Sequence, residues 1–131
     1  MNEIDILSGR VCPYCKERSE LIDSKFIYGK SYGMVWKCPD PACDAYVGVH
    51  KGTEIALGRL ANRELREYKK MAHAEFDKIW RLGIMKRREA YEWLSNQMQL
   101  SKDLCHIGMF DVAQCQKVIE ICKTFIDEKG D

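Results

Sequence analysis

The chain has 131 residues, of which 46% are hydrophobic and 31% charged, and its formal net charge is +1. This composition is typical of a globular chain of one domain or two small ones. It excludes a strongly basic nucleic-acid binder, so any contact with nucleic acid must come from a local basic patch. No stretch reaches the roughly 18 apolar residues of a membrane span, and the N-terminus carries acids where a secretory signal would be basic. We therefore expect a cytosolic protein without membrane contact.

Two short cysteine pairs lie in the first third of the chain: Cys12 with Cys15, and Cys38 with Cys43. Each pair can form a tight knuckle, and together the four thiolates complete the tetrahedron that Zn²⁺ takes in structural sites. An iron–sulfur cluster is the chemical rival, but the strand-rich stretch between the pairs favours zinc. The seven cysteines, an odd number, fit reduced thiols and a metal better than a disulfide framework. We predict one structural zinc ion.

Three segments around these cysteines are suited to strands: 21–28, 34–38 and 45–50. The first two are rich in β-branched and aromatic residues, and the glycines within 28–33 predict a hairpin turn between them. A sheet of this size cannot bury enough apolar surface to be stable alone. Zinc binding would supply the missing free energy, on the order of 10 kcal/mol in small zinc domains. Residues 1–52 are therefore predicted to form a zinc-ribbon-like module.

The rest of the chain, 53–131, is predicted to be helical. Apolar residues recur along one face over 62–81, and Gly83 is expected to end this helix. A second helix is expected over 86–99, and a third begins after Asp111, a good N-cap. The predicted fold class is α+β: a small zinc-ribbon-like three-stranded antiparallel module followed by three packed α-helices. We expect the helical part to pack against the ribbon as one compact unit.

Several short motifs resemble those of a known family. They are Cys-Pro-Tyr-Cys at 12–15, Asp-Ala-Tyr-Val-Gly at 44–48, Arg-Leu-Ala-Asn at 59–62 and Cys-His-Ile-Gly-Met-Phe-Asp at 105–111. On these motifs most of the chain resembles a phage and prophage family of unknown function, a zinc-finger-containing domain. The resemblance implies a zinc finger joined to a helical part, and a phage or prophage origin, hence the cytosol of a bacterial host. It implies no reaction and no catalytic residues, so only the four zinc cysteines carry over.

A basic stripe is the main candidate for a contact with nucleic acid. Six basic side chains are candidates, the first four on the side opposite the apolar face of the first predicted helix: Arg59, Arg63, Arg66, Lys70, Arg87 and Arg88. Such a stripe could track the phosphates of DNA or RNA. The alternative is an ordinary solvated helix face, because glutamates interleave with the cations. Aromatic residues of the ribbon could stack on single-stranded bases or belong to the core: Tyr14, Tyr32, Trp36 and Tyr46.

The remaining cysteines carry a weaker signal. Cys105 and the adjacent His106 could suggest a second metal site or a nucleophile. Cys115 and Cys122 lie on the apolar face of the third helix, where a free cysteine behaves as a small hydrophobe. The sequence contains no glycine-rich phosphate loop, helical His-Glu-x-x-His motif or Gly-x-Ser-x-Gly turn. Enzymatic activity is therefore not expected, although a nuclease with acids from separate elements stays open.

The leading hypothesis is a zinc-binding phage or prophage accessory protein that contacts nucleic acid through the basic stripe. The alternative is a protein-interaction module that binds or inhibits a host or phage protein and has no nucleic-acid role. The near-neutral charge permits this second reading, as do three side chains that could be exposed: Tyr32, Met34 and Met109. The sequence does not determine the oligomeric state.

Overall fold

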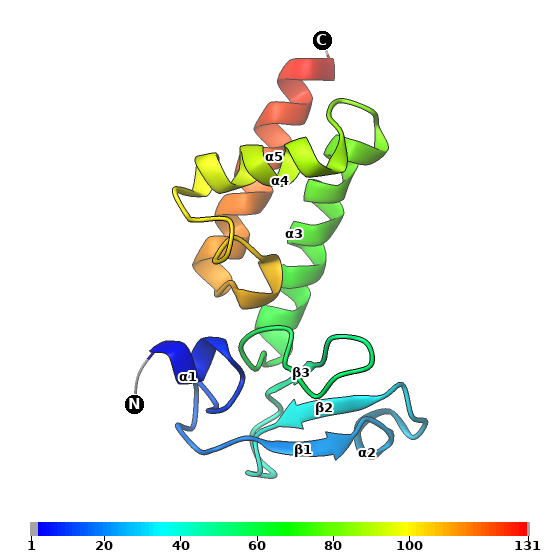
Figure 1. The fold of residues 1–131 in the computed structure, drawn as a ribbon, viewed down its shortest axis with the longest axis vertical. Helices are drawn as coiled ribbons and strands as arrows, with labels where there is room; N and C mark the ends of the chain where they lie inside the picture. The colour runs from blue at the N-terminus through cyan, green and yellow to red at the C-terminus, as the bar shows by residue number, and fades with distance from the viewer. Residues whose placement is uncertain (1–2, 131) are drawn as a thin grey trace. The chain divides into compact units, whose positions relative to one another are not determined.

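The computed structural model describes residues 3–130, which divide into two compact units between Glu64 and Leu65 (Figure 1). The elements in chain order are α1 (Glu3–Leu7), β1 (Glu20–Asp23), α2 (Lys25–Tyr28), β2 (Met34–Lys37), β3 (Tyr46–Gly48), α3 (Arg63–Arg81), α4 (Arg87–Met98), the 3-10 turn η1 (Ile107–Met109) and α5 (Val112–Gly130). The predicted α+β class, with one antiparallel sheet followed by helices, is confirmed. The module boundary at residue 52 and the packing of both parts as one unit stay predictions. Within the described residues, no helix combines the length and the apolar character needed to cross a membrane.

The sheet of the first unit has β2 in the centre, antiparallel to both β1 and β3. Trp36 on β2 lies opposite Leu21 on one side and Val47 on the other, so these three side chains share one face of the sheet. A bridge between Tyr46 and Ala61 extends the pairing beyond β3, with N–H···O distances of 3.1 and 2.9 Å. The segment that leads into α3 is therefore held against the edge of the sheet.

The prediction of one continuous strand over 21–28 is wrong beyond Asp23. The Asp23 carboxylate accepts a hydrogen bond from the amide of Lys25 (2.9 Å), and the Ser24 carbonyl accepts one from the amide of Tyr28 (3.0 Å). The chain coils here into α2 instead of continuing the strand. Short polar side chains offer the backbone an alternative to the ladder of a sheet, and here they override the β propensity of their neighbours.

The N-terminal helix α1, which the sequence did not predict, is followed by a tight contact at Gly9. Gly9 has φ +76°, and a Cβ placed there would lie 2.7 Å from the Cβ of Ala56 and 2.9 Å from the carbonyl oxygen of Gly58. Only glycine fits both the left-handed backbone and this close approach. Gly9 thus packs the N-terminal segment onto the loop between β3 and α3.

The second unit is built around the apolar faces of its helices. The rings of Phe76 on α3 and Tyr91 on α4 meet edge to face with centroids 4.9 Å apart, and Trp93 on α4 lies 4.6 Å from Phe125 on α5. The buried side chains that line this core are Leu65, Ala72, Phe76 and Ile79 of α3, Ala90, Leu94 and Met98 of α4, and Cys115, Val118 and Cys122 of α5. The predicted core role of the two α5 cysteines is confirmed.

Two predicted helix signals are confirmed in this unit. Gly83 has φ +76° and follows the end of α3 at Arg81, as expected of a glycine stop. At the start of α5, the Asp111 carboxylate accepts a hydrogen bond from the Gln114 amide (2.8 Å). The Gln114 side chain accepts one from the Asp111 amide in return (3.0 Å). This reciprocal pair is a capping box.

Candidate metal centre

The sulfur atoms of Cys12, Cys15, Cys38 and Cys43 all lie within 4.8 Å of one another. The Sγ atoms of Cys12 and Cys43 are 3.7 Å apart. Four thiolates placed about 2.3 Å from one zinc ion in a tetrahedron are separated by roughly 3.8 Å, whereas a disulfide requires about 2.05 Å. The spacing therefore fits a tetrahedral four-thiolate zinc site and not a disulfide. Within residues 3–130 it is the one group of three or more side chains placed to hold a metal ion.

The first knuckle is a tight turn that aims two sulfurs to the same side. The Cys12 amide donates to the Glu17 carbonyl (2.8 Å) and the Lys16 amide donates to the Cys12 carbonyl (2.9 Å). Lys16 adopts a left-handed backbone with φ 64°, which is uncommon for a residue other than glycine. Its ammonium group bonds the Pro13 carbonyl at 2.7 Å and helps to hold this turn. The chain thereby reverses directly after Cys15.

The second knuckle is organised by Asp40. Its carbonyl accepts a hydrogen bond from the Cys43 amide (3.0 Å), and its carboxylate accepts one from the Ala42 amide (2.9 Å). The Lys37 ammonium bonds the carbonyls of Cys38 (3.1 Å) and Cys43 (3.3 Å) and so spans the base of the turn. These bonds account for the longer spacing of this pair, because they close a turn with four residues between its cysteines.

Three of the four thiols have shifted pKa values. A hydrogen bond to Cys43 raises the pKa of Cys15 to about 12, and burial raises the pKa of Cys38. Burial alone would also raise the pKa of Cys43, but hydrogen bonds from the Ala45 amide and the neighbouring thiols outweigh burial and lower it. Cys43 therefore ionises at a lower pH than Cys15 and Cys38, which release their protons when a metal binds.

The cysteines also form the core of the first unit. Cys12 and Cys38 are fully buried and pack with Ala45, Val47 and Leu60 in one cluster. Four protein ligands leave no open coordination position for a substrate or a water molecule. The arrangement is therefore that of a structural centre, with the metal in the place where a larger domain would have apolar side chains.

A family model described as a zinc-finger-containing domain matches residues 8–125 of the chain. The chain belongs to this family. Comparisons with the curated proteins and with the solved structures find no match. The match includes all four cysteines of the cluster, and together with the geometry it supports one structural zinc ion in this zinc-finger-containing domain. The predicted membership is confirmed, whereas a phage or prophage origin stays a prediction.

Helix α3 carries three of the basic residues predicted to contact nucleic acid. Arg63 and Lys70 are exposed, whereas Arg66 is half-buried. The ammonium group of Lys70 lies 3.7 Å from a carboxylate oxygen of Glu67, in an exposed ion pair of little energetic weight. The stripe predicted on this helix therefore consists of two exposed cations and a third that is partly withdrawn from solvent.

The other three basic candidates lie on different elements. Arg59 is half-buried in the first unit, before α3 begins. Arg87 on α4 lies over the rings of Trp80 and Tyr91, with its guanidinium carbon 5.5 and 5.7 Å from the two centroids. Arg88 is also on α4 and is exposed. Arg87 thus has a packing role within the second unit, which the charge pattern alone did not indicate.

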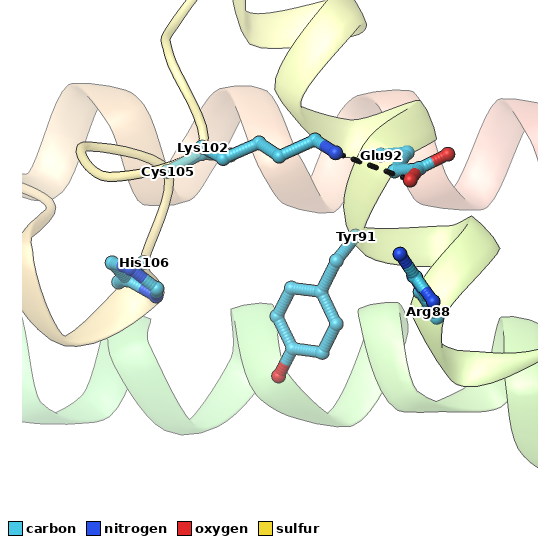
Figure 2. Close-up of a pocket in the computed structure, with 6 residues that line it drawn as sticks. All are labelled: Arg88, Tyr91, Glu92, Lys102, Cys105 and His106. Atoms are coloured by element: carbon cyan, nitrogen blue, oxygen red, sulfur yellow. Dashed lines mark hydrogen bonds and ion pairs between the residues drawn. The ribbon is translucent and has the colours of Figure 1, made fainter.

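Arg88 borders a depression of about 380 Å³ in the second unit (Figure 2). In Figure 2, Lys102 extends toward Glu92, and its ammonium group lies 3.1 Å from the Glu92 carboxylate. Cys105 and His106 line the same depression. Burial raises the pKa of Cys105, so it stays a protonated thiol at neutral pH, and neither residue belongs to a group of three metal ligands among the described residues.

The predicted stacking residues of the ribbon have different surroundings. Trp36 packs against the cysteine core and donates its indole N–H to the Glu54 carbonyl (2.6 Å). The Tyr14 hydroxyl accepts a hydrogen bond from the Asn62 amide (3.3 Å). Tyr32, in contrast, is 73% exposed. The strand predicted over 21–28 gave no indication of the exposed aromatic residues within 26–28.

Proposed function

We propose that this protein is a zinc-stabilised accessory protein that contacts nucleic acid through the exposed cations of α3. The observation that supports the proposal is the arrangement of Arg63, Arg66 and Lys70, which helical spacing places within about 60° of one another. Leu65 and Ala72, both buried, point to the opposite side of the same helix. Arg63 and Lys70, the two exposed cations, are therefore directed away from the core, where phosphates can approach them, and the half-buried Arg66 lies beside them.

The N-terminus of α3 adds little to phosphate binding, because the backbone amide of Arg63 already donates to the Asp44 carboxylate (3.2 Å). A phosphate would meet a negative charge there. The proposed contact consequently depends on side chains, which bind DNA and RNA backbones alike. The resemblance noted in the sequence suggests the setting that we propose, a phage or prophage function in replication, recombination or transcription inside a bacterial host.

The test is a titration by fluorescence anisotropy of the zinc-loaded protein against single-stranded DNA, duplex DNA and RNA, at low and moderate salt. The informative variant is Arg63→Glu/Lys70→Glu, which leaves the half-buried Arg66 unchanged. An acid at the first position of a helix is favourable, so the fold should be retained. Lys117→Glu/Lys123→Glu on α5 changes the net charge equally at exposed positions and serves as the control.

We expect the α3 variant to lose roughly tenfold or more in affinity and to lower the salt slope by about one for each phosphate contact removed. The control variant should bind nearly as wild type does. Equal losses in the two variants would show a general charge effect. Such a result, or no binding by wild type at low salt, would contradict the proposal.

A second candidate function, a module that binds or inhibits a host protein, is favoured by one feature of the loop between β3 and α3. Ile55 is 65% exposed and Leu57 is 44% exposed. Neighbouring exposed apolar side chains are typical of protein contact sites. A host protein retained by immobilised wild type and lost with Ile55→Ser/Leu57→Ser would support this function. Equal retention by both would exclude the loop.

A further inference from the structure

Two tyrosine rings are exposed on the first unit without a place in its core. Tyr28 is 53% exposed and Tyr32 is 73% exposed, and their centroids lie 5.8 Å apart with the rings nearly perpendicular. Tyr28 is anchored, because its hydroxyl is 2.7 Å from that of Tyr46 and its ring meets that of Tyr46 edge to face. Tyr32 therefore presents its ring to solvent beside a fixed neighbour.

The two rings border a depression of about 530 Å³ that lies entirely within the first unit. Its lining also includes the apolar side chains of Met34 and Val49. Lys51 carries the single charge among the described residues that line it. The volume is in the range of sites that take small molecules or single groups of larger ligands, about 300–1,000 Å³. The site thus combines flat aromatic surface with positive charge.

A second lysine stands beside the exposed ring. The ammonium group of Lys30 lies 5.8 Å from the centroid of Tyr32. The neighbouring acid, Asp23, faces its own turn, where it accepts a hydrogen bond from the Lys25 amide. Hydrogen bonds from Lys25 and Ser31 hold its pKa below the usual range. The charge that faces the depression is therefore positive and favours an anionic ligand. The tyrosine rings favour a ligand that also has a flat ring.

We propose that Tyr28, Lys30, Tyr32 and Lys51, here called the tyrosine–lysine surface, bind an unpaired nucleobase together with its flanking phosphates. The inference rests on the proposed function and adds a strand preference to it. Every base has a face that can stack on an aromatic ring, and lysines along the path neutralise the backbone. In a duplex those faces are covered by neighbouring base pairs, so this surface distinguishes single strands from duplex.

A neutral apolar peptide fits the surface less well. Such a ligand would use the rings of Tyr28 and Tyr32 but would leave Lys30 and Lys51 without a counter-charge. A nucleotide uses both kinds of side chain at once, because its base is flat and its phosphates are anionic. Charge complementarity therefore selects the nucleic acid.

The experiment compares binding of a short labelled oligothymidine and of a duplex of equal length to the zinc-loaded full chain. Tyr32→Ala removes the ring, and Tyr32→Phe keeps the ring without its hydroxyl. Phe26→Ala is the matched control, because Phe26 is also 73% exposed yet does not border the depression. Circular dichroism and zinc content verify that each variant is folded.

We expect Tyr32→Ala to weaken single-strand binding roughly tenfold or more and duplex binding by less than about twofold. Tyr32→Phe and Phe26→Ala should bind as wild type does, and Lys51→Gln should lower the salt slope by about one.

If wild type binds no nucleic acid, both this inference and the proposed function are overturned. If the α3 double variant loses affinity but Tyr32→Ala keeps it, only the tyrosine–lysine surface is overturned. Loss of a protein partner in Tyr32→Ala, with oligonucleotide affinity unchanged, would likewise overturn it in favour of a protein site.

Discussion

The Asp44 carboxylate accepts a hydrogen bond from the backbone amide of Arg63 at 3.2 Å. Asp44 directly follows the zinc ligand Cys43, and Arg63 is the first residue of α3. A helix leaves its first amides without partners inside the helix, and side-chain oxygens commonly satisfy them. The Asp44 side chain, next to the metal centre, therefore also stabilises the start of α3.

Replacing Asp44 by alanine should destabilise the zinc-loaded protein by about 1 kcal/mol, because the Arg63 amide loses its acceptor. Asp44→Asn should retain most of the stability, since an amide oxygen can still accept this bond. Urea unfolding followed by circular dichroism measures both free energies. Equal losses in the two variants would mean that the charge of Asp44, and not the hydrogen bond to Arg63, is what stabilises the protein.

Removal of zinc should unfold the first unit and leave helical structure in the second. Without the metal, the core cluster consists of thiols around Ala45, Val47 and Leu60, which is too small to be stable alone. After chelation, the four ligand cysteines should react rapidly with an alkylating agent, whereas the buried Cys122 should stay protected. Mass spectrometry of the labelled peptides gives the pattern, and circular dichroism gives the retained helicity. Simultaneous loss of all helical signal would show instead that the chain unfolds as one cooperative domain.

Gly9→Ala should destabilise the first unit by more than Gly29→Ala. Both glycines have a left-handed backbone, with φ +76° and +79°, which costs an alanine about 1–2 kcal/mol. At Gly29 the new methyl group meets nothing within 4 Å, whereas at Gly9 it would lie 2.7 Å from the Cβ of Ala56. The two variants separate backbone strain from steric overlap, and urea unfolding measures the difference. Equal destabilisation would show that the segment around Gly9 can shift freely.

The stability of the second unit should fall at alkaline pH through Cys122. Burial raises the pKa of this thiol to about 12, compared with about 8.5 for an exposed thiol. The unfolded chain therefore loses this proton at a lower pH than the folded chain does. The contribution of the protonated thiol is complete below about pH 8.5 and is lost as the pH rises toward 12.

Cys122→Ala removes this titration, so its unfolding free energy should depend less steeply on pH above about pH 9 than that of wild type. The variant should also be less stable at neutral pH, because a buried side chain is shortened. Urea titrations across this pH range measure both effects. Parallel pH profiles would contradict the role of Cys122.

The sequence predicted those features whose signals are local. The spacing of Cys12 and Cys15 indicates a knuckle, and Asp111 followed by an apolar repeat indicates a helix start, because few competing conformations satisfy such short patterns. The failure at 24–28 has a local cause as well. The strand-forming side chains of this segment led to the prediction of a strand. The Asp23 carboxylate accepts a hydrogen bond from the Lys25 amide instead, and the chain turns into α2.

Features that depend on distant contacts could not be predicted in this way. Gly9 contacts Ala56, and the Arg63 amide donates to Asp44. In both cases the sequence around one residue does not identify its distant partner. The same holds for the candidate sites. A helical wheel places Arg66 on the polar side of α3, but its partial burial follows from packing that a one-dimensional pattern does not contain.

The four zinc ligands all lie within the first 43 residues, ahead of α3, α4 and α5. During synthesis, the metal can therefore be captured while the helical segment has still to be translated. Maturation of the first unit then depends on the zinc available to the nascent chain and not on completion of the protein. If the second unit keeps its helices without zinc, as predicted above, a cell short of zinc would release chains in which the helices have formed and the sheet has not.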